Sequence, residues 1–213
     1  MRTARSNLGI SMIEIMVVVA IVAVLAGVAG PNFSTFIKNS QIKNTAESVL
    51  SGLQMARMEA LRRNTSIRFQ LTNNLTSSCV LSTSSANWII NFDSDGNGGS
   101  NSVNNACNVV LFNAAFPTTD TVNNPAPQIL KKHSTSEGAG TVQIVSEQNT
   151  ITFDAAGRVT NAANPPIDID FSNTAGGACA PTGNMRCMRI VVTIGGQVRM
   201  CVPSLPSTDT RAC

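Results

Sequence analysis

The apolar run GISMIEIMVVVAIVAVLAG, residues 9–27, constrains this chain more than any other feature of its sequence. Glu14 is the only ionisable side chain in that run. A helix over residues 10–30 would be about 30 Å long, which matches the hydrocarbon thickness of a bilayer. Arg2 and Arg5 precede it, and basic residues hold that end of a span in the cytoplasm. We therefore predict a transmembrane helix over residues 10–30 with a cytoplasmic N-terminus.

A cleaved secretory signal peptide is the ordinary alternative for this segment. Such a peptide also has a basic start, an apolar middle and small residues before its cleavage point, here Gly27 and Ala29. Glu14 argues against it, because a carboxylate placed mid-helix in a bilayer costs on the order of 2.5 to 3.5 kcal/mol. That cost is usually tolerated where the acid has a function. On the alternative, the chain would be a secreted protein such as a hydrolase.

The helical pattern continues beyond the apolar run, over residues 31–63. Apolar residues recur there at spacings of three and four, which is typical of a single stripe along a helix. The stripe consists of Phe33, Phe36, Ile37, Ala46, Val49, Leu50, Leu53, Ala56 and Ala60. Since the opposite side is polar and charged, we predict an amphipathic helix that lies against a globular domain.

Residues 64–213 change to short apolar runs separated by turn residues, which is typical of a β-rich, mostly antiparallel domain. The runs are SIRFQL, WIINF, VVLF, VQIV, ITF, IDIDF, RIVVTI and QVRMCV. ITFDAAGRV and VVTIGGQVRM each predict a hairpin. In the second, Gly195 and Gly196 would supply the positive φ angles of a tight turn.

Six cysteines, all after residue 78, indicate disulfide bonds and an oxidising compartment. They are Cys79, Cys107, Cys179, Cys187, Cys201 and Cys213. None has C-x-x-C spacing and the chain has one histidine, so a shared metal site is disfavoured. Six cysteines permit fifteen pairings, among which the sequence cannot choose. We favour Cys79 with Cys107, Cys187 with Cys201, and Cys179 with Cys213, although a strict two-residue turn would point Cys187 away from Cys201.

Binding and catalytic motifs are sparse. The stretch from Asp93 through Asp95 and Asn97 begins like a calcium loop, but Asn104 stands where the bidentate Glu belongs, so an Asx-rich turn is favoured. His133 lies in a polar stretch and predicts a solvated loop, not a general base. Asp168 and Asp170 alternate with apolar residues and should face solvent from one strand. We predict no enzyme, cofactor or metal.

The N-terminal residues resemble type IV pilins and the pseudopilins of type II secretion. In that family a prepilin peptidase cuts a basic leader after a glycine, and a glutamate follows five residues into the mature chain. Gly9, Ile10 and Glu14 fit, although Ile10 and Ser11 replace the commoner Phe and Thr. The resemblance implies a leader over residues 1–9, and N-methylation of Ile10. In a filament, Glu14 would neutralise the α-amino group of a neighbouring subunit, since each charge is tolerated in low dielectric only when paired.

Three stretches resemble, more narrowly, the GspH/FimT branch: NWIINFDSDGNG, ITFDAAGRV and MRCMRIVVTIGGQVRMCVP. The resemblance implies a pilin-like α+β fold, with a long helix, transmembrane and then amphipathic, packed on an antiparallel β-rich domain. It implies a FimT/FimU-like minor type IV pilin in the inner membrane, and in the pilus after assembly. Its partners would be the prepilin peptidase, major and minor pilins, inner-membrane assembly components and membrane lipid. The alternative within the family is a GspH-type minor pseudopilin of type II secretion.

A further alternative is DNA binding for natural transformation, because some FimT-type proteins carry a G-R-x-R motif in this hairpin. The chain keeps Gly196 and Arg199 but has Gln197 where the first arginine belongs. The candidate contacts are Arg186, Arg189, Gly196, Arg199 and Arg211. We expect the few nearby acids, of which Asp209 is closest, not to cancel this charge. The net charge of +3 is too small to attract nucleic acid by itself.

Overall fold

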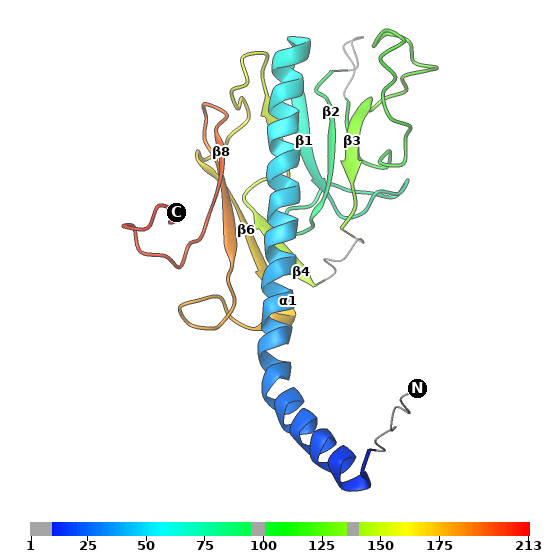
Figure 1. Cartoon of the computed structure of the whole chain (residues 1–213). Helices are drawn as coiled ribbons and strands as arrows, with labels where there is room; N and C mark the ends of the chain where they lie inside the picture. The colour runs from blue at the N-terminus through cyan, green and yellow to red at the C-terminus, as the bar shows by residue number, and fades with distance from the viewer. Residues whose placement is uncertain (1–9, 95–100, 136–140) are drawn as a thin grey trace, which may run out of the picture. The chain divides into compact units, whose positions relative to one another are not determined.

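A computed structural model of the chain describes residues 10–94, 101–135 and 141–213 (Figure 1). Of residues 26–32 it describes the helical backbone but not the side chains. The chain divides into two compact units, Met1–Ile37 and Lys38–Cys213.

One long helix, a short 3-10 helix and eight strands make up the regular structure of these residues. The long helix α1 runs from Met12 to Arg63. The remaining elements, in chain order, are β1 (Ile67–Thr72), β2 (Asn87–Phe92), β3 (Ile129–His133), β4 (Val142–Ser146), β5 (Thr150–Phe153), β6 (Ile167–Asn173), the 3-10 helix η1 (Thr174–Gly176), β7 (Met188–Val192) and β8 (Val198–Cys201).

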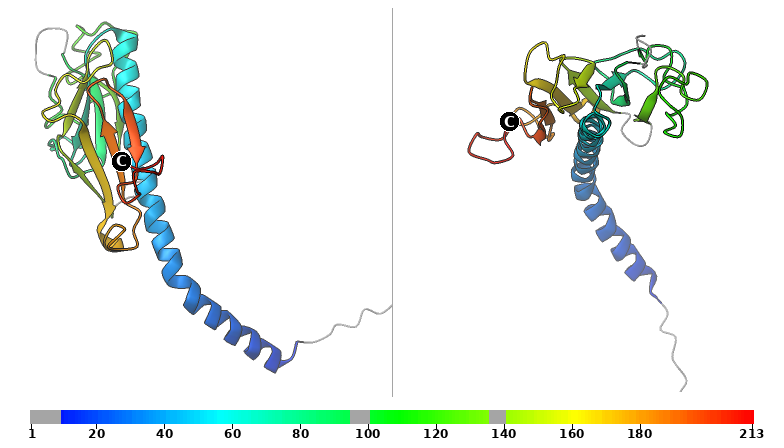
Figure 2. Two further views of the ribbon diagram at one scale, coloured as in Figure 1. Left: turned by 90° about the vertical axis from the view of Figure 1, so that its left-hand side faces the viewer. Right: turned by 90° about the horizontal axis from the view of Figure 1, so that it is seen from above.

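The strands form two four-stranded sheets, with the orders β3-β2-β1-β5 and β4-β6-β7-β8. Every pair of neighbouring strands is antiparallel. Within the domain, the two sheets lie next to each other, and the second half of α1 packs against the same side of both (Figures 1 and 2). The predicted α+β, pilin-like architecture is therefore confirmed.

The core of the domain forms where α1 meets both sheets. Six residues of the helix have no exposed surface: Ile42, Ala46, Val49, Leu53, Ala56 and Ala60. Their alternating spacing of four and three keeps them on one face of the helix. The predicted stripe is thus confirmed from Ala46 onward, whereas Phe33 and Phe36 are 64% and 69% exposed. Those two residues precede Lys38, where the domain unit begins.

Gly52 marks a close approach between the helix and the first sheet. A Cβ atom at this position would lie 2.8 Å from Cε2 of Phe69 and 3.0 Å from Cε2 of Trp88. Ser48, one turn earlier, accepts a hydrogen bond from Nε1 of Trp88 at 3.2 Å. The absence of a side chain at Gly52 therefore lets α1 lie directly against β1 and β2.

The first sheet differs from the prediction at its outer strand. The predicted strand VVLF does not form; Leu111 makes only an isolated parallel bridge with Ile129, while Val110 is exposed. The position beside β2 is taken by β3, whose two lysines and histidine conceal a strand pattern. The prediction that His133 lies in a solvated loop is wrong, because its ring stacks on Trp88 with centroids 5.4 Å apart.

Both predicted hairpins are present, with looser turns than expected. In the β7–β8 hairpin Val192 pairs with Val198, so the connection is longer than two residues. Of its two glycines only Gly196 has a positive φ, 75°. In the other hairpin Phe153 and Val159 form a single antiparallel bridge, and Gly157 has a φ of 72°.

The three disulfides join Cys79 to Cys107, Cys179 to Cys187, and Cys201 to Cys213. The first pairing confirms the prediction; the other two predicted pairings are wrong. The register places Cys201 opposite Arg189, so the direct cross-strand partner of Cys201 is not Cys187. Cys187 instead closes a short loop with Cys179.

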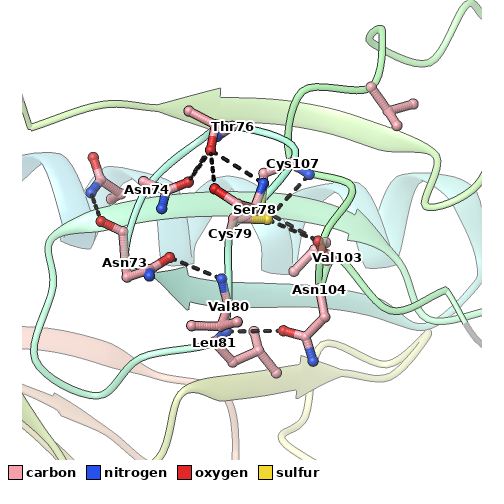
Figure 3. The surroundings of a disulfide bond; sticks show 12 residues. Asn73, Asn74, Thr76, Ser78, Cys79, Val80, Leu81, Val103, Asn104 and Cys107 are labelled. Carbon is pink, nitrogen blue, oxygen red and sulfur yellow. Dashed lines mark hydrogen bonds between the residues drawn. A yellow bond between two sulfur atoms is a disulfide. The ribbon is translucent and has the colours of Figure 1, made fainter.

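The disulfide between Cys79 and Cys107 is buried in a small second core with Ile89, Val103 and Ile129 (Figure 3). Two asparagines hold the loop around it: the backbone N–H of Val80 donates to Oδ1 of Asn73 at 2.9 Å, and that of Leu81 donates to Oδ1 of Asn104 at 3.0 Å. The disulfide and its buried neighbours thus hold this loop region together in place of regular strands.

Candidate functional site

The start of α1 carries the candidate assembly site. The backbone N–H groups of Glu14 and Ile15 donate to the carbonyl oxygen of Ser11 at 3.0 and 3.2 Å. Glu14 therefore lies in the first turn of the helix, and its description as a mid-helix carboxylate is corrected. Ser11 and Glu14 have the spacing of a capping box, and the positive end of the helix dipole favours a carboxylate there. Gly9, the other half of the predicted cleavage site, lies outside the described residues.

The apolar side chains after this turn have no cover in the single chain. Every residue from Ile10 to Leu25 is exposed, and the large apolar ones are at least 53% exposed. Glu14 is exposed as well. A helix that is apolar on all sides is stable in water only when something else covers it. Residues 26–30, the end of the predicted span, lie outside the residues whose side chains are described.

Over the part of the chain that could be searched, we find no helix long and apolar enough to cross a membrane.

Two of the candidate DNA-binding arginines, Arg189 and Arg211, pair with aspartates. Arg189 donates to Asp170 through Nε at 2.7 Å and Nη2 at 2.9 Å, and to Asp168 through Nη1 at 2.7 Å. These bonds to Asp170 raise the pKa of Arg189, while burial raises the pKa of Asp168. Both aspartates do lie on the outward face of β6, as expected, but they do not simply face solvent, because they hold an arginine of β7 there.

The other three arginines do not gather beside Arg189 as one free cluster. Arg211 pairs with Asp209 at 2.8 Å, and this hydrogen bond lowers the pKa of Asp209 to about 2. Arg199 donates to the carbonyl oxygens of Ala212 and Cys213 at 3.4 and 3.2 Å. Arg186 lies elsewhere, where its backbone N–H bonds to Asn39 of α1. The premise that nearby acids leave this charge uncancelled is therefore wrong for Arg189 and Arg211, the two of these arginines that form ion pairs with aspartates.

Gly196 has a structural role that explains it without a ligand. A Cβ atom on Gly196 would lie 1.8 Å from the carbonyl oxygen of Gly157, in the turn of the other hairpin. The same carbonyl accepts a hydrogen bond from Nε of Arg57 on α1 at 3.1 Å. The two hairpin turns and the helix thus meet at this point, and a larger residue would push them apart.

Of the three candidate calcium ligands, Asp93, Asp95 and Asn97, the structure describes only Asp93. Asp93 forms an ion pair with Arg68, while Asp95 and Asn97 lie outside the described residues. Among the residues that the structure does describe, no group of three or more His, Cys, Asp or Glu residues could hold a metal ion.

The arrangement defines a class of protein: a helix with an uncovered apolar half and a buried half, carrying a domain of two antiparallel sheets, is that of pilin-type filament subunits. The family model described as type II transport protein GspH matches residues 45–196, more than half of the chain. The chain therefore belongs to the GspH family, and the resemblance to the GspH/FimT branch of pilins is confirmed.

Two solved structures of the type IV minor pilin FimU of Pseudomonas aeruginosa are similar to this chain. One is 16% identical with a TM-score of 0.42, and covers 82% of this chain and 95% of its own. The other, in a second crystal form, is 17% identical with a TM-score of 0.38, and covers 78% and 94%. No curated protein matches the chain.

Proposed function

We propose that this chain is a minor type IV pilin of the FimT/FimU type, which takes part in priming and assembly of the pilus. The observation that carries the proposal is the uncovered apolar helix with Glu14 in its first turn. The folded domain leaves this helix without partners of its own. Other pilin helices and the inner-membrane lipid are the partners whose chemistry matches it.

Glu14 gives the assembly step its chemistry. Prepilin peptidase would cut between Gly9 and Ile10 and leave a positive α-amino group on Ile10. In the filament, the α-amino group of one subunit and Glu14 of its neighbour would form an ion pair away from water. A charge left unpaired in such surroundings costs several kcal/mol, so correctly placed subunits are favoured over misplaced ones. Inner-membrane assembly components would deliver the subunits.

The first test is the N-terminus of the chain purified from membranes. We expect mass spectrometry to find Ile10 as the first residue, with or without an N-methyl group. An N-terminus at Gly30 would contradict the proposal, since it would show that a signal peptidase had removed the helix.

The second test separates assembly from folding. We expect Glu14→Ala to be processed and membrane-inserted yet at least tenfold depleted from sheared pili, because only the charge partner is lost. Glu47→Ala is the matched control: this acid also lies on α1, is exposed, and pairs only with Lys43 at 3.6 Å. Equal amounts of the two variants in sheared pili would argue against the role of Glu14.

A GspH-type minor pseudopilin of type II secretion is the second candidate, favoured by the description of the matched family. Both machines use the same kind of helix, so the structure of one subunit supports either. Deletion of the gene separates them: loss of pili with normal protein secretion supports the pilin, and the reverse result supports the pseudopilin.

A further inference from the structure

We propose that the domain carries a basic collar, formed by Lys38, Lys43 and Arg186, that binds the anionic headgroups of the bilayer in which the apolar helix is anchored. The inference rests on the membrane anchoring in the proposed function. It adds a second, electrostatic contact with the membrane, made by the folded domain.

The collar surrounds the place where the chain enters the domain unit. Nζ of Lys38 donates to the carbonyl oxygen of Ala175 at 2.7 Å, and the N–H of Arg186 donates to Oδ1 of Asn39 at 2.8 Å. Asn173 adds a longer bond to Gln41 at 3.4 Å. These contacts hold the loop after β6 against the first turns of α1 within the domain.

The loop is fixed firmly enough to present its charge in one place. The disulfide between Cys179 and Cys187 closes it, and Met185 anchors it in the main core without any exposed surface. Arg186, between the buried methionine and the disulfide, is itself exposed. Asn39 and Lys43 are four positions apart on α1 and share a face, so Arg186 and Lys43 lie on the same side of the helix.

The segments that carry the collar contain basic side chains and no acidic ones. Residues 37–46 and 172–188 together contain three basic side chains and no acidic one. The nearest acid along α1 is Glu47, which pairs with the exposed ammonium of Lys43 at 3.6 Å, a distance that leaves the pair weak in water. Glu137 lies outside the described residues. Arg189, by contrast, is already neutralised by two aspartates.

The position along the chain identifies the partner as a lipid headgroup. Lys38 is the first charged residue after Glu14. Lys38 lies eight positions after residue 30 along the helix, a rise of about 12 Å. Phe33 and Phe36 lie between and are exposed, so the stretch that leads to the collar is still apolar. The headgroup layer extends about 5 to 7 Å beyond the hydrocarbon core. Lys38 and Arg186, whose backbone bonds to Asn39, therefore come within about one Debye length of this layer, with Lys43 about one turn farther, and cations there are attracted to anionic lipid.

The test uses the full chain in nanodiscs, with phosphatidylcholine alone or mixed with phosphatidylglycerol. Hydrogen exchange is followed by mass spectrometry for residues 38–44 and 174–186. We expect about fivefold slower exchange per engaged cation in the anionic discs, an effect that is lost at about 1 M salt. Lys43→Gln with Arg186→Gln should abolish the difference. Lys38 is left unchanged because its bond to Ala175 holds the loop in place.

The matched control is Lys131→Gln with Arg62→Gln, which removes one exposed lysine and one exposed arginine from elsewhere on the domain. It should keep the lipid-dependent slowing. Equal exchange in both kinds of disc, or loss of the difference in the control as well, would overturn the basic collar while leaving the anchor intact. Failure of the wild-type chain to enter either disc would overturn the anchoring itself, and the collar with it.

Discussion

The two halves of α1 contain the same apolar residue types, but these residues are exposed in the first half and buried in the second. Over residues 10–25, and at Phe33, Phe36 and Ile37, the large apolar side chains are exposed on all sides of the helix. After Lys38, six small or branched residues repeat at spacings of four and three and are completely buried against the two sheets. The apolar face of the second half is covered by the domain itself, while the apolar side chains of the first half need lipid or other helices to cover them. The comparison teaches that the folded domain depends on one half of the helix, whereas the proposed association depends on the other.

The largest expected effect of a substitution on stability lies in the buried half. Leu53→Ala should lower the free energy of unfolding by about 2 to 5 kcal/mol, since Leu53 has no exposed surface and its removal leaves a cavity in the main core. Leu25→Ala, on the apolar half, should change it by less than about 0.5 kcal/mol. Denaturant titrations of both variants in the same detergent measure the difference. Equal losses would show that the first half also contributes to the fold.

The disulfides should contribute next, and all of them belong to the domain unit. Removal of the bridge between Cys79 and Cys107, by alanine at both positions, should cost roughly 3 kcal/mol. The bridge between Cys179 and Cys187 closes a shorter loop, with a separation of 8 residues against 28, and should cost about 1 kcal/mol less. Thermal unfolding of the two double variants checks the order. A reversed order would mean that the short loop holds α1 in place.

Gly52→Ala should be destabilising in spite of the better helix propensity of alanine. The added Cβ would meet Phe69 at 2.8 Å, and such overpacking costs about 1 to 3 kcal/mol, against about 1 kcal/mol gained in the helix. Ser51→Ala introduces the same residue at the adjacent exposed position and should be neutral or slightly stabilising. Denaturation midpoints of the two variants decide the point. A stabilised Gly52→Ala would show that the helix can move away from the sheet.

Local patterns predicted the helix and most of the sheet correctly. The apolar run, the spacing of Ala46, Val49 and Leu53, and the alternation in β1 and β6 are periodicities along the chain, and these decide which face of an element is buried. Glu14 was identified by its isolation in the apolar run. Its place in the first turn was not predicted, although the capping-box spacing of Ser11 and Glu14 is visible in the sequence.

Contacts between distant segments were harder to predict. β3 carries two lysines and a histidine, and only its pairing with β2 makes it a strand. The pairing of Cys201 depended on a turn that is longer than two residues, which shifts the register by one. The capture of Arg189 by two aspartates depends on the adjacency of β6 and β7. The sequence did contain a signal for this contact, since IDID carries two aspartates at alternating positions and RIVV carries an arginine on another strand.

Charge separates the two units as clearly as burial does, because Glu14 is the only acid before Lys38. The acid sensitivity of folding should therefore come from the domain. A hydrogen bond from Arg211 lowers the pKa of Asp209 from its ordinary value of 3.8 to about 2. A lowered pKa in the folded state means that the carboxylate stabilises the fold above about pH 4, and that this contribution is lost as the pH falls toward 2. Asp168 has the opposite sign: burial raises its pKa, so its ionisation opposes folding.

The smallest expected effect is thus the loss of the Asp209 contribution at low pH. Asp209 and Arg211 are exposed partners near the end of the chain, so the difference between wild type and Asp209→Asn should be small at pH 7 and should vanish by about pH 2. Carboxyl carbon chemical shifts give the pKa of each aspartate directly, and should place Asp209 below 3.8 and Asp168 above it. Glu14→Gln is the control, and should leave the pH dependence of domain unfolding unchanged. If instead this variant flattened the acid transition, the two halves of α1 would be coupled, and the division of labour between fold and association would not hold.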